Sequence, residues 1–160
     1  MRGGKCGRRG YGAKLAALYL RLDTVPSHAS SSARMLKIYA YSGCGSCRQA
    51  LKFLHARGIA HTVTPIREQP PTLAELKWML GQYGGDVRKL FNTSGQDYRA
   101  LGLGTKLASL PTAEALALLT SNGNLVKRPF AIATNGGRVG FREDEWSAWL
   151  PRPAAVRVPG

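Results

Sequence analysis

Residues 35–48 constrain the fold of this 160-residue chain more than any other segment. Leu36, Ile38 and Ala40 alternate with Lys37 and two tyrosines, and this period of two predicts a β-strand. A Ser-Gly turn follows the strand, and residues 48–54 then show helical periodicity. The sequence therefore predicts a strand, a glycine turn and a helix, with two cysteines where the turn meets the helix.

The two cysteines form a C-x-x-C motif, Cys44 and Cys47. Cys44 falls at the expected N-terminus of the helix, where unpaired backbone N–H groups and the positive end of the helix dipole stabilise a thiolate. Arg48 adds a positive charge one turn later. We therefore expect a lowered pKa for Cys44. Cys47 is placed to close a disulfide with Cys44 or to resolve a mixed disulfide formed on it.

Two other roles compete for a C-x-x-C motif, namely half of a zinc site and a pair of buried structural thiols. His55 and His61 lie too close to the cysteines for the usual zinc-finger spacing, and the remaining cysteine, Cys6, belongs to a segment of doubtful origin. No metal is therefore expected. The flanking glycines and the start of a helix argue against inert thiols, so redox or nucleophilic chemistry is favoured, although a single C-x-x-C is only moderately specific.

The composition is that of a single domain with an ordinary core. The chain has 160 residues, of which 44% are hydrophobic. No apolar stretch approaches the length of a membrane-spanning helix, so we expect a soluble protein that does not bind a membrane. Three cysteines do not make a disulfide framework, which favours a reducing, cytoplasmic location.

The formal net charge of +14 lies largely in the two ends of the chain. Residues 1–34 hold seven Lys and Arg residues and one acid, residues 151–160 add two arginines, and the segment between carries +6. Its basic residues are scattered and are not interleaved with aromatic residues. Direct nucleic-acid binding is therefore not favoured, and attraction of anions to the active site is the functional alternative to generic basicity.

The same division predicts the domain organisation. Residues 1–34 are rich in Gly, Arg and Ser, so we expect a basic, flexible leader or a start codon assigned too early, with the native protein beginning at Met35. An organellar targeting leader is a weaker alternative, and a secretory signal fits poorly because Arg21 and Asp23 interrupt its apolar part. Residues 35–150 form the expected domain, and residues 151–160 form a flexible tail.

Beyond the first helix, the pattern predicts a β-α-β unit. Gly58 is expected to cap the helix, and residues 60–66 read as a second strand. Thr72 and Glu75 form a capping box that opens another helix. The face of that helix is expected to consist of Leu73, Leu76 and Leu80.

The rest of the chain reads as helices followed by strands. A final helix begins at Glu143 and packs through Trp146, Trp149 and Leu150. The expected helical segments before it are 87–91, 98–101 and 112–119, and the expected strands are 125–128, 130–133 and 138–141, the last two joined by a turn at Asn135-Gly136-Gly137. The elements together predict an α/β protein with a thioredoxin-like fold and an inserted helical subdomain.

Five sequence blocks match a known family in the right order: YSGCGSCR (41–48), LFNTSG (90–95), YRALGL (98–103), LVKRP (125–129) and VGFREDEW (139–146). Over residues 35–150 the chain resembles the arsenate reductase and Spx family of thioredoxin-fold proteins. The resemblance implies that Cys44 is the nucleophile that attacks the arsenic oxyanion. It also implies that Arg128 contacts the oxyanion and that Pro129 is commonly cis beside the active cysteine.

The chain also departs from the family pattern. Asn92 stands where oxyanion-reducing members carry an arginine, and Ala40 stands where some carry a histidine. Both differences weaken arsenate recognition. Cys47 replaces a serine of those enzymes, as in Spx-type regulators, and gives the chain its own resolving thiol. The predicted catalytic residues are Cys44, Cys47 and Arg128, and the predicted oxyanion-binding or site-shaping residues are Arg48, Pro129, Asn92 and Arg142.

Three functions follow from these patterns. The first is a thiol–disulfide oxidoreductase resembling arsenate reductase, with no bound cofactor and with glutathione, glutaredoxin or thioredoxin as its electron donor. The second is an Spx-type redox-sensing transcription regulator that binds RNA polymerase. The third, nucleic-acid binding through the basic ends, ranks last because it leaves the C-x-x-C motif without a role.

Overall fold

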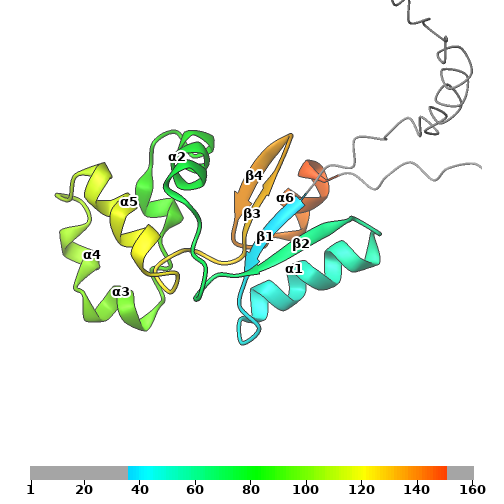
Figure 1. Cartoon of the computed structure of the whole chain (residues 1–160), viewed down its shortest axis with the longest axis horizontal. Helices are drawn as coiled ribbons and strands as arrows, with labels where there is room; N and C mark the ends of the chain where they lie inside the picture. The colour runs from blue at the N-terminus through cyan, green and yellow to red at the C-terminus, as the bar shows by residue number, and fades with distance from the viewer. Residues whose placement is uncertain (1–35, 151–160) are drawn as a thin grey trace, which may run out of the picture. The chain divides into compact units, whose positions relative to one another are not determined.

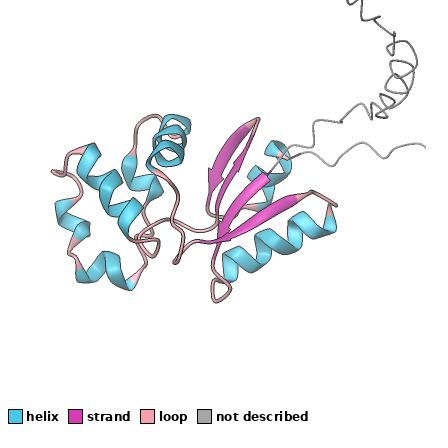
Figure 2. Cartoon of the chain, viewed as in Figure 1, coloured by secondary structure: helices cyan, strands magenta, loops and turns pink. Residues whose placement is uncertain are grey.

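The computed structural model describes residues 36–150, and the predictions for residues 1–34, for Met35 and for residues 151–160 lie outside these described residues. Four strands form one mixed sheet in the order β2-β1-β3-β4 (Figures 1 and 2). None of the helices within the described range is long and apolar enough to cross a membrane.

The sheet is built around the strand that precedes the cysteines. Strand β1 (Leu36–Ala40) pairs in parallel with β2 (His61–Pro65) and antiparallel with β3 (Phe130–Ala133). Strand β4 (Gly136–Val139) continues the sheet antiparallel to β3. Helix α1 (Gly45–Ala56) makes the crossover between the two parallel strands, which cannot be joined by a tight hairpin. The predicted β-α-β unit is therefore confirmed.

Strand β1 is buried on both of its faces. Leu36, Ile38 and Ala40 belong to the core shared with α1 and with the final helix, α6 (Glu143–Trp149). Tyr39 points to the other face and lies in the core that includes helix α2 (Leu73–Gln82). The alternation predicted from the sequence is correct, but its second face is covered as well, which is characteristic of a central strand with helices on both sides.

A helical insert connects β2 to β3. It contains α2, the 3₁₀ helix η1 (Val87–Leu90), α3 (Gln96–Ala100), α4 (Leu103–Lys106) and α5 (Thr112–Ser121). Figure 1 shows these helices grouped beside the sheet, in green and yellow. Their apolar side chains join Tyr39 and Phe130 of the sheet in one core cluster. The predicted helical insert is therefore present, with α4 as an additional short helix.

Two strand predictions differ from the structure, one entirely and one by two residues. Residues 125–128 form no strand, because Leu125 and Val126 close turns with Asn122 and Gly123 and Val126 makes only an isolated bridge to Phe91. Both apolar side chains are buried in the insert core, so their apolar run reflects burial rather than sheet pairing.

The last strand, β4, begins two residues earlier than predicted, at Gly136. The turn before it is formed by residues 134–135, and Gly136 and Gly137 are already in β4, so that Phe141 lies outside the strand. A side chain at Gly137 would collide with Met79 and Trp78 of α2, which explains why a glycine stands in this strand.

The buried face of α2 consists of Leu76 and Met79, with Leu80 half-buried, whereas the predicted Leu73 is exposed at the first helical position.

Glu75 joins the start of α2 to strand β1. Its carboxylate completes the predicted capping box with Thr72 and also accepts hydrogen bonds from Lys37 Nζ at 2.9 Å and from Tyr39 Oη at 2.8 Å. Partial burial opposes ionisation, but the hydrogen bonds from Lys37, Thr72 and Tyr39 outweigh it and lower the pKa of Glu75 to about 2. The charged carboxylate is therefore part of the contact between insert and sheet.

Replacing this carboxylate, in a Glu75→Gln variant, is expected to lower the free energy of unfolding at pH 7 by about 2 kcal/mol. Because the folded-state pKa lies below the ordinary value of 4.5, the stabilisation is complete above pH 4.5 and is lost as the pH falls towards 2. Urea denaturation at several pH values would measure it. The exposed Glu68→Gln is the matched control, and a Glu75→Gln deficit that does not shrink with acidification would contradict the assignment.

Candidate active site

Cys44 is the N-cap residue of α1, with an extended backbone at φ −95° and ψ 122°. Its N–H donates to the Tyr41 carbonyl at 3.0 Å, and its own carbonyl accepts the first helical hydrogen bond from the Arg48 N–H at 3.1 Å. The glycine turn and the start of the helix thus hold the half-buried Cys44 side chain at the end of the helix where backbone N–H groups are free, as the sequence predicted.

The environment of Cys44 favours its thiolate. The sulfur lies 3.1 Å from Ser46 Oγ. Partial burial would raise the pKa of Cys44, but hydrogen bonds from Ser46 and Cys47 and the positive charge of Arg128 outweigh it, so the pKa is lowered. The predicted direction is confirmed. Arg48, by contrast, is exposed, and its Nη1 reaches the Ser42 carbonyl at 3.5 Å, so the positive charge that acts on the sulfur comes from elsewhere in the chain.

Cys47 has the opposite environment. It lies one turn into α1, is only 1% exposed and packs in the core between α1 and the sheet. Burial, reinforced by the neighbouring Cys44, raises the pKa of Cys47 to about 12. Both cysteines are free. At neutral pH the pair therefore consists of one accessible sulfur that ionises readily and one buried sulfur that retains its proton.

Arg128 and Pro129 reach this site from the segment that leads into β3, and the peptide bond between them is cis. The Ser46 hydroxyl lies 3.4 Å from the Arg128 carbonyl and 3.1 Å from the Cys44 sulfur. Because a thiolate can only accept, this hydroxyl donates to the sulfur when Cys44 is ionised. The structure therefore brings Cys44, Cys47, Arg128 and Pro129 together, as the resemblance implied, and adds Ser46 to them.

Two arginine side chains lie over the ring of Tyr41, the residue that begins the glycine turn. The guanidinium carbon of Arg67 lies 3.7 Å from the ring centroid and that of Arg128 lies 5.3 Å from it. Arg67 follows β2 and was not singled out in the sequence. Neither its spacing nor its neighbours in the chain connect it to the cysteines, so only the fold reveals it. Ser46 could have been noticed, because it lies inside the C-x-x-C motif.

The remaining predicted residues differ in their placement. Asn92 lies beside Arg67 and Arg128 in one pocket and donates through Nδ2 to the Asn124 carbonyl at 3.2 Å. Arg142 is exposed at the N-cap of α6, where it pairs with Asp144 at 3.1 Å and Glu145 at 3.4 Å. The structure thus engages Arg142 with the acids of its own helix and does not assign it to the group around Cys44.

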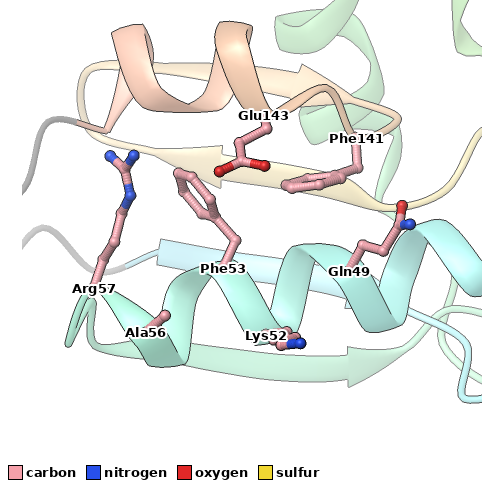
Figure 3. Close-up of a pocket in the computed structure, with 7 residues that line it drawn as sticks. All are labelled: Gln49, Lys52, Phe53, Ala56, Arg57, Phe141 and Glu143. Carbon is pink, nitrogen blue, oxygen red and sulfur yellow. The ribbon is translucent and has the colours of Figure 1, made fainter.

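The pocket that contains Asn92, Arg67 and Arg128 has a volume of about 500 Å³ and is formed mainly by the insert. A larger pocket of about 650 Å³ lies between α1 and the start of α6 (Figure 3), and neither cysteine lines either of the two pockets. It is lined by Gln49, Lys52, Phe53, Ala56, Arg57, Phe141 and Glu143. Within residues 36–150, no three His, Cys, Asp or Glu side chains gather as a metal site would require. The smaller pocket shares Arg128 with the surroundings of Cys44.

The pKa of Cys47 predicts the pH dependence of disulfide closure between the two cysteines. A thiol with a pKa near 12 is almost entirely protonated at pH 7, so its reactive thiolate increases about tenfold for each pH unit. Closure of the Cys44–Cys47 bond from a preformed adduct is therefore expected to accelerate throughout pH 6 to pH 9, whereas the rate of the first attack by Cys44, whose pKa is lowered, should stop rising at a lower pH. Rapid quenching and mass analysis would separate the two steps. Equal pH slopes would contradict the assignment of roles.

Comparison with known proteins identifies relatives of this chain. The family model described as "ArsC family" matches residues 39–149. The uncharacterized protein YusI of Bacillus subtilis is 43% identical over 111 residues, which cover 69% of this chain and 94% of that protein. The global transcriptional regulator Spx of Listeria monocytogenes is 30% identical over 118 residues, which cover 74% of this chain and 88% of that regulator.

A solved structure supports the same relationship. The arsenate reductase from Vibrio cholerae superposes with a TM-score of 0.65 at 27% identity, over 74% of this chain and 99% of that one. The match spans both the sheet and the insert, and it confirms the predicted thioredoxin-like fold with an inserted helical subdomain.

Proposed function

Since this chain belongs to the ArsC family, we propose that it is a thiol–disulfide oxidoreductase of the arsenate reductase type, with Cys44 as the nucleophile and Cys47 as the resolving thiol. The observation that carries the proposal is the asymmetry of the pair. One sulfur is accessible and has a lowered pKa, and the other is buried and has a pKa of about 12. This difference separates the attacking group from the resolving group.

With arsenate, the Cys44 thiolate bonds to arsenic and one arsenate oxygen leaves as water after protonation. Cys47 then loses its proton and attacks the Cys44 sulfur, forming the Cys44–Cys47 bond while the electron pair of the sulfur–arsenic bond passes to arsenic. The two thiols are oxidised to a disulfide, and arsenate is reduced to arsenite. A thiol reductant of the glutathione, glutaredoxin or thioredoxin class then restores both thiols.

Arg128 has the role of stabilising negative charge in this scheme. Its positive charge lowers the pKa of Cys44, and its backbone carbonyl lies 3.4 Å from the same Ser46 hydroxyl that contacts the sulfur. An arginine held by the loop opposite the nucleophile provides a preorganised donor for an oxyanion formed at that sulfur. Pro129, in its cis peptide, shapes the segment that presents Arg128.

A second candidate is an Spx-type regulator in which the same disulfide alters a surface that binds RNA polymerase. Two observations favour it specifically. The chain shares 30% identity with Spx over most of that regulator, and Asn92 stands where oxyanion-reducing members carry an arginine. The two functions differ in their oxidant, because the reductase requires arsenate as substrate whereas a sensor responds to general oxidants.

The test uses the full chain carrying Cys6→Ser, so that Cys44 and Cys47 are its only thiols. The reduced protein is exposed separately to arsenate, to hydroxyethyl disulfide and to hydrogen peroxide, and the loss of thiols is followed by titration and peptide mass analysis. Arsenate-dependent loss of two thiols with stoichiometric arsenite supports the reductase. Oxidation by disulfide and peroxide alone supports a sensor or another thiol oxidoreductase. Two thiols that survive all three reagents exclude redox chemistry at this motif.

A further inference from the structure

The pocket lined by Arg67 and Arg128 carries an unusual arrangement of charge. Arg67 and Arg128 both lie against the ring of Tyr41, and both line the same pocket of about 500 Å³. Among residues 36–150, neither guanidinium forms an ion pair with an acidic side chain. Two like charges held at one aromatic ring repel each other, and an anion between them would relieve that repulsion.

The same pocket also contains one acid, Asp97. Its Oδ2 accepts hydrogen bonds from Asn122 Nδ2 at 2.8 Å and from Asn124 Nδ2 at 3.2 Å, which fix the carboxylate in place. These hydrogen bonds, together with the positive charge of Arg67, lower the pKa of Asp97 and keep it ionised. Asp97 and Arg67 are not paired with each other at ion-pair distance, so both charges remain available to a ligand.

Two residues that line this pocket each hold a buried polar atom without a hydrogen-bond partner among residues 36–150. Nη1 of Arg128, a donor, and Oδ1 of Asn124, an acceptor, are buried without a hydrogen-bond partner in the described part of the chain. Buried polar atoms are almost always paired, so two exceptions at one site need a reason. Among the residues that the structure describes, Nη1 of Arg128 lacks an acceptor, and Oδ1 of Asn124 lacks a donor. The charged groups of the pocket differ in the same way, because the two arginines are donors and Asp97 is an acceptor.

We propose that this pocket binds the end of a small disulfide that carries both a carboxylate and an ammonium group, with the carboxylate against Arg67 and Arg128 and the ammonium group against Asp97. Arg67 is thereby a specificity-determining residue. The inference rests on the proposed thiol–disulfide chemistry of Cys44. A purely anionic ligand would be repelled by Asp97, and a purely cationic ligand would be repelled by the two arginines.

The position of Arg128 connects the pocket to the chemistry. Arg128 lines the pocket, and its carbonyl lies 3.4 Å from the Ser46 hydroxyl, which contacts the Cys44 sulfur. A disulfide seated there is attacked by the Cys44 thiolate, which forms a mixed disulfide and releases the other half as a thiolate that takes a proton from water. Cys47 then loses its proton and displaces the second half. The protein dithiol is oxidised, and the small disulfide is reduced to two thiols.

The experiment measures the first attack alone, in the full chain carrying Cys6→Ser and Cys47→Ser so that Cys44 is the only thiol. Four symmetrical disulfides serve as probes: cystine with both charges, dithiodipropionate with carboxylates only, cystamine with ammonium groups only, and neutral hydroxyethyl disulfide. Mass analysis gives the rate of mixed disulfide formation. Each rate is divided by the rate with N-acetylcysteine, which removes the intrinsic reactivity of each probe.

We expect the normalised rate to be about tenfold higher for cystine than for the neutral disulfide, because two charged contacts are gained. Arg67→Gln should lower the rates with cystine and dithiodipropionate and leave the neutral probe unchanged. Asp97→Asn, which keeps an acceptor for Asn122 and Asn124, should remove the advantage of cystine over dithiodipropionate. Arg88→Gln and Glu114→Gln remove exposed charges outside the pocket and serve as matched controls.

The outcomes separate this inference from the proposed function. Equal normalised rates for all four disulfides, or an Arg67→Gln effect no larger than that of Arg88→Gln, would overturn the pocket assignment while leaving Cys44 chemistry intact. A dithiodipropionate rate as high as that of cystine would overturn the role of Asp97. A Cys44 that reacts with none of the probes, the neutral one included, would overturn the proposed function and this inference with it.

Discussion

A Cys44→Ser variant is expected to lose at least about a thousandfold in the rate at which the protein is oxidised by arsenate or by small disulfides. The reason is that the serine hydroxyl does not ionise near neutral pH, and Cys47, the one thiol left when the variant also carries Cys6→Ser, is buried and protonated. The substitution exchanges sulfur for oxygen at a half-buried helix N-cap, where serine is itself a favourable residue, so the fold should be retained. Thiol loss followed by mass analysis measures the effect.

The complementary variant, Cys47→Ser, distinguishes the two roles. In a protein that also carries Cys6→Ser, it should keep the first attack and accumulate a stable mixed disulfide on Cys44, because no second thiol is present to displace it. Circular dichroism of both variants checks that they are folded. Rapid oxidation of the Cys44→Ser protein through Cys47 would show that the pair had been assigned in the wrong order.

The second large effect concerns stability. Gly123→Ala is expected to lower the free energy of unfolding by about 3 kcal/mol or more. A side chain at Gly123 would collide with the backbone carbonyl of Ile66 and the α-carbon of Arg67, and backbone atoms cannot move aside as a flexible side chain can. The turn that contains Gly123 would have to separate from the end of β2, which disturbs Arg67 as well. Urea denaturation of the wild-type and variant proteins provides the measurement.

Gly81→Ala is the matched control, because a side chain at Gly81 in α2 would meet no atom within 4 Å. Alanine favours the helix over glycine by about 0.5–1 kcal/mol, so this variant should be as stable as the wild type or slightly more stable. Similar losses in the two variants would show that the close approach of residues 66–67 to Gly123 does not determine stability.

Local sequence patterns were sufficient to predict most elements of the fold. The alternation in residues 36–40, the capping box of Thr72 and Glu75, and the tryptophans of the final helix each depend on neighbours within a few positions, and the structure reproduces all three. Residues 125–128 were assigned wrongly because an apolar run indicates burial without specifying its partner. Here the partner is the core of the insert, which is assembled from helices distant in the sequence.

The sequence by itself determined the reactive motif, since Cys44, its turn and the start of the helix lie within one short segment whose geometry is local. The charged residues near that motif are brought there by the tertiary fold. Arg67 from the end of β2, Arg128 from the approach to β3 and Asp97 from the insert line one pocket only because the sheet order and the helical crossover bring these segments together. Charge acts through space, so Arg128 lowers the pKa of Cys44 from far along the chain and adds to the local hydrogen bonds from Ser46 and Cys47.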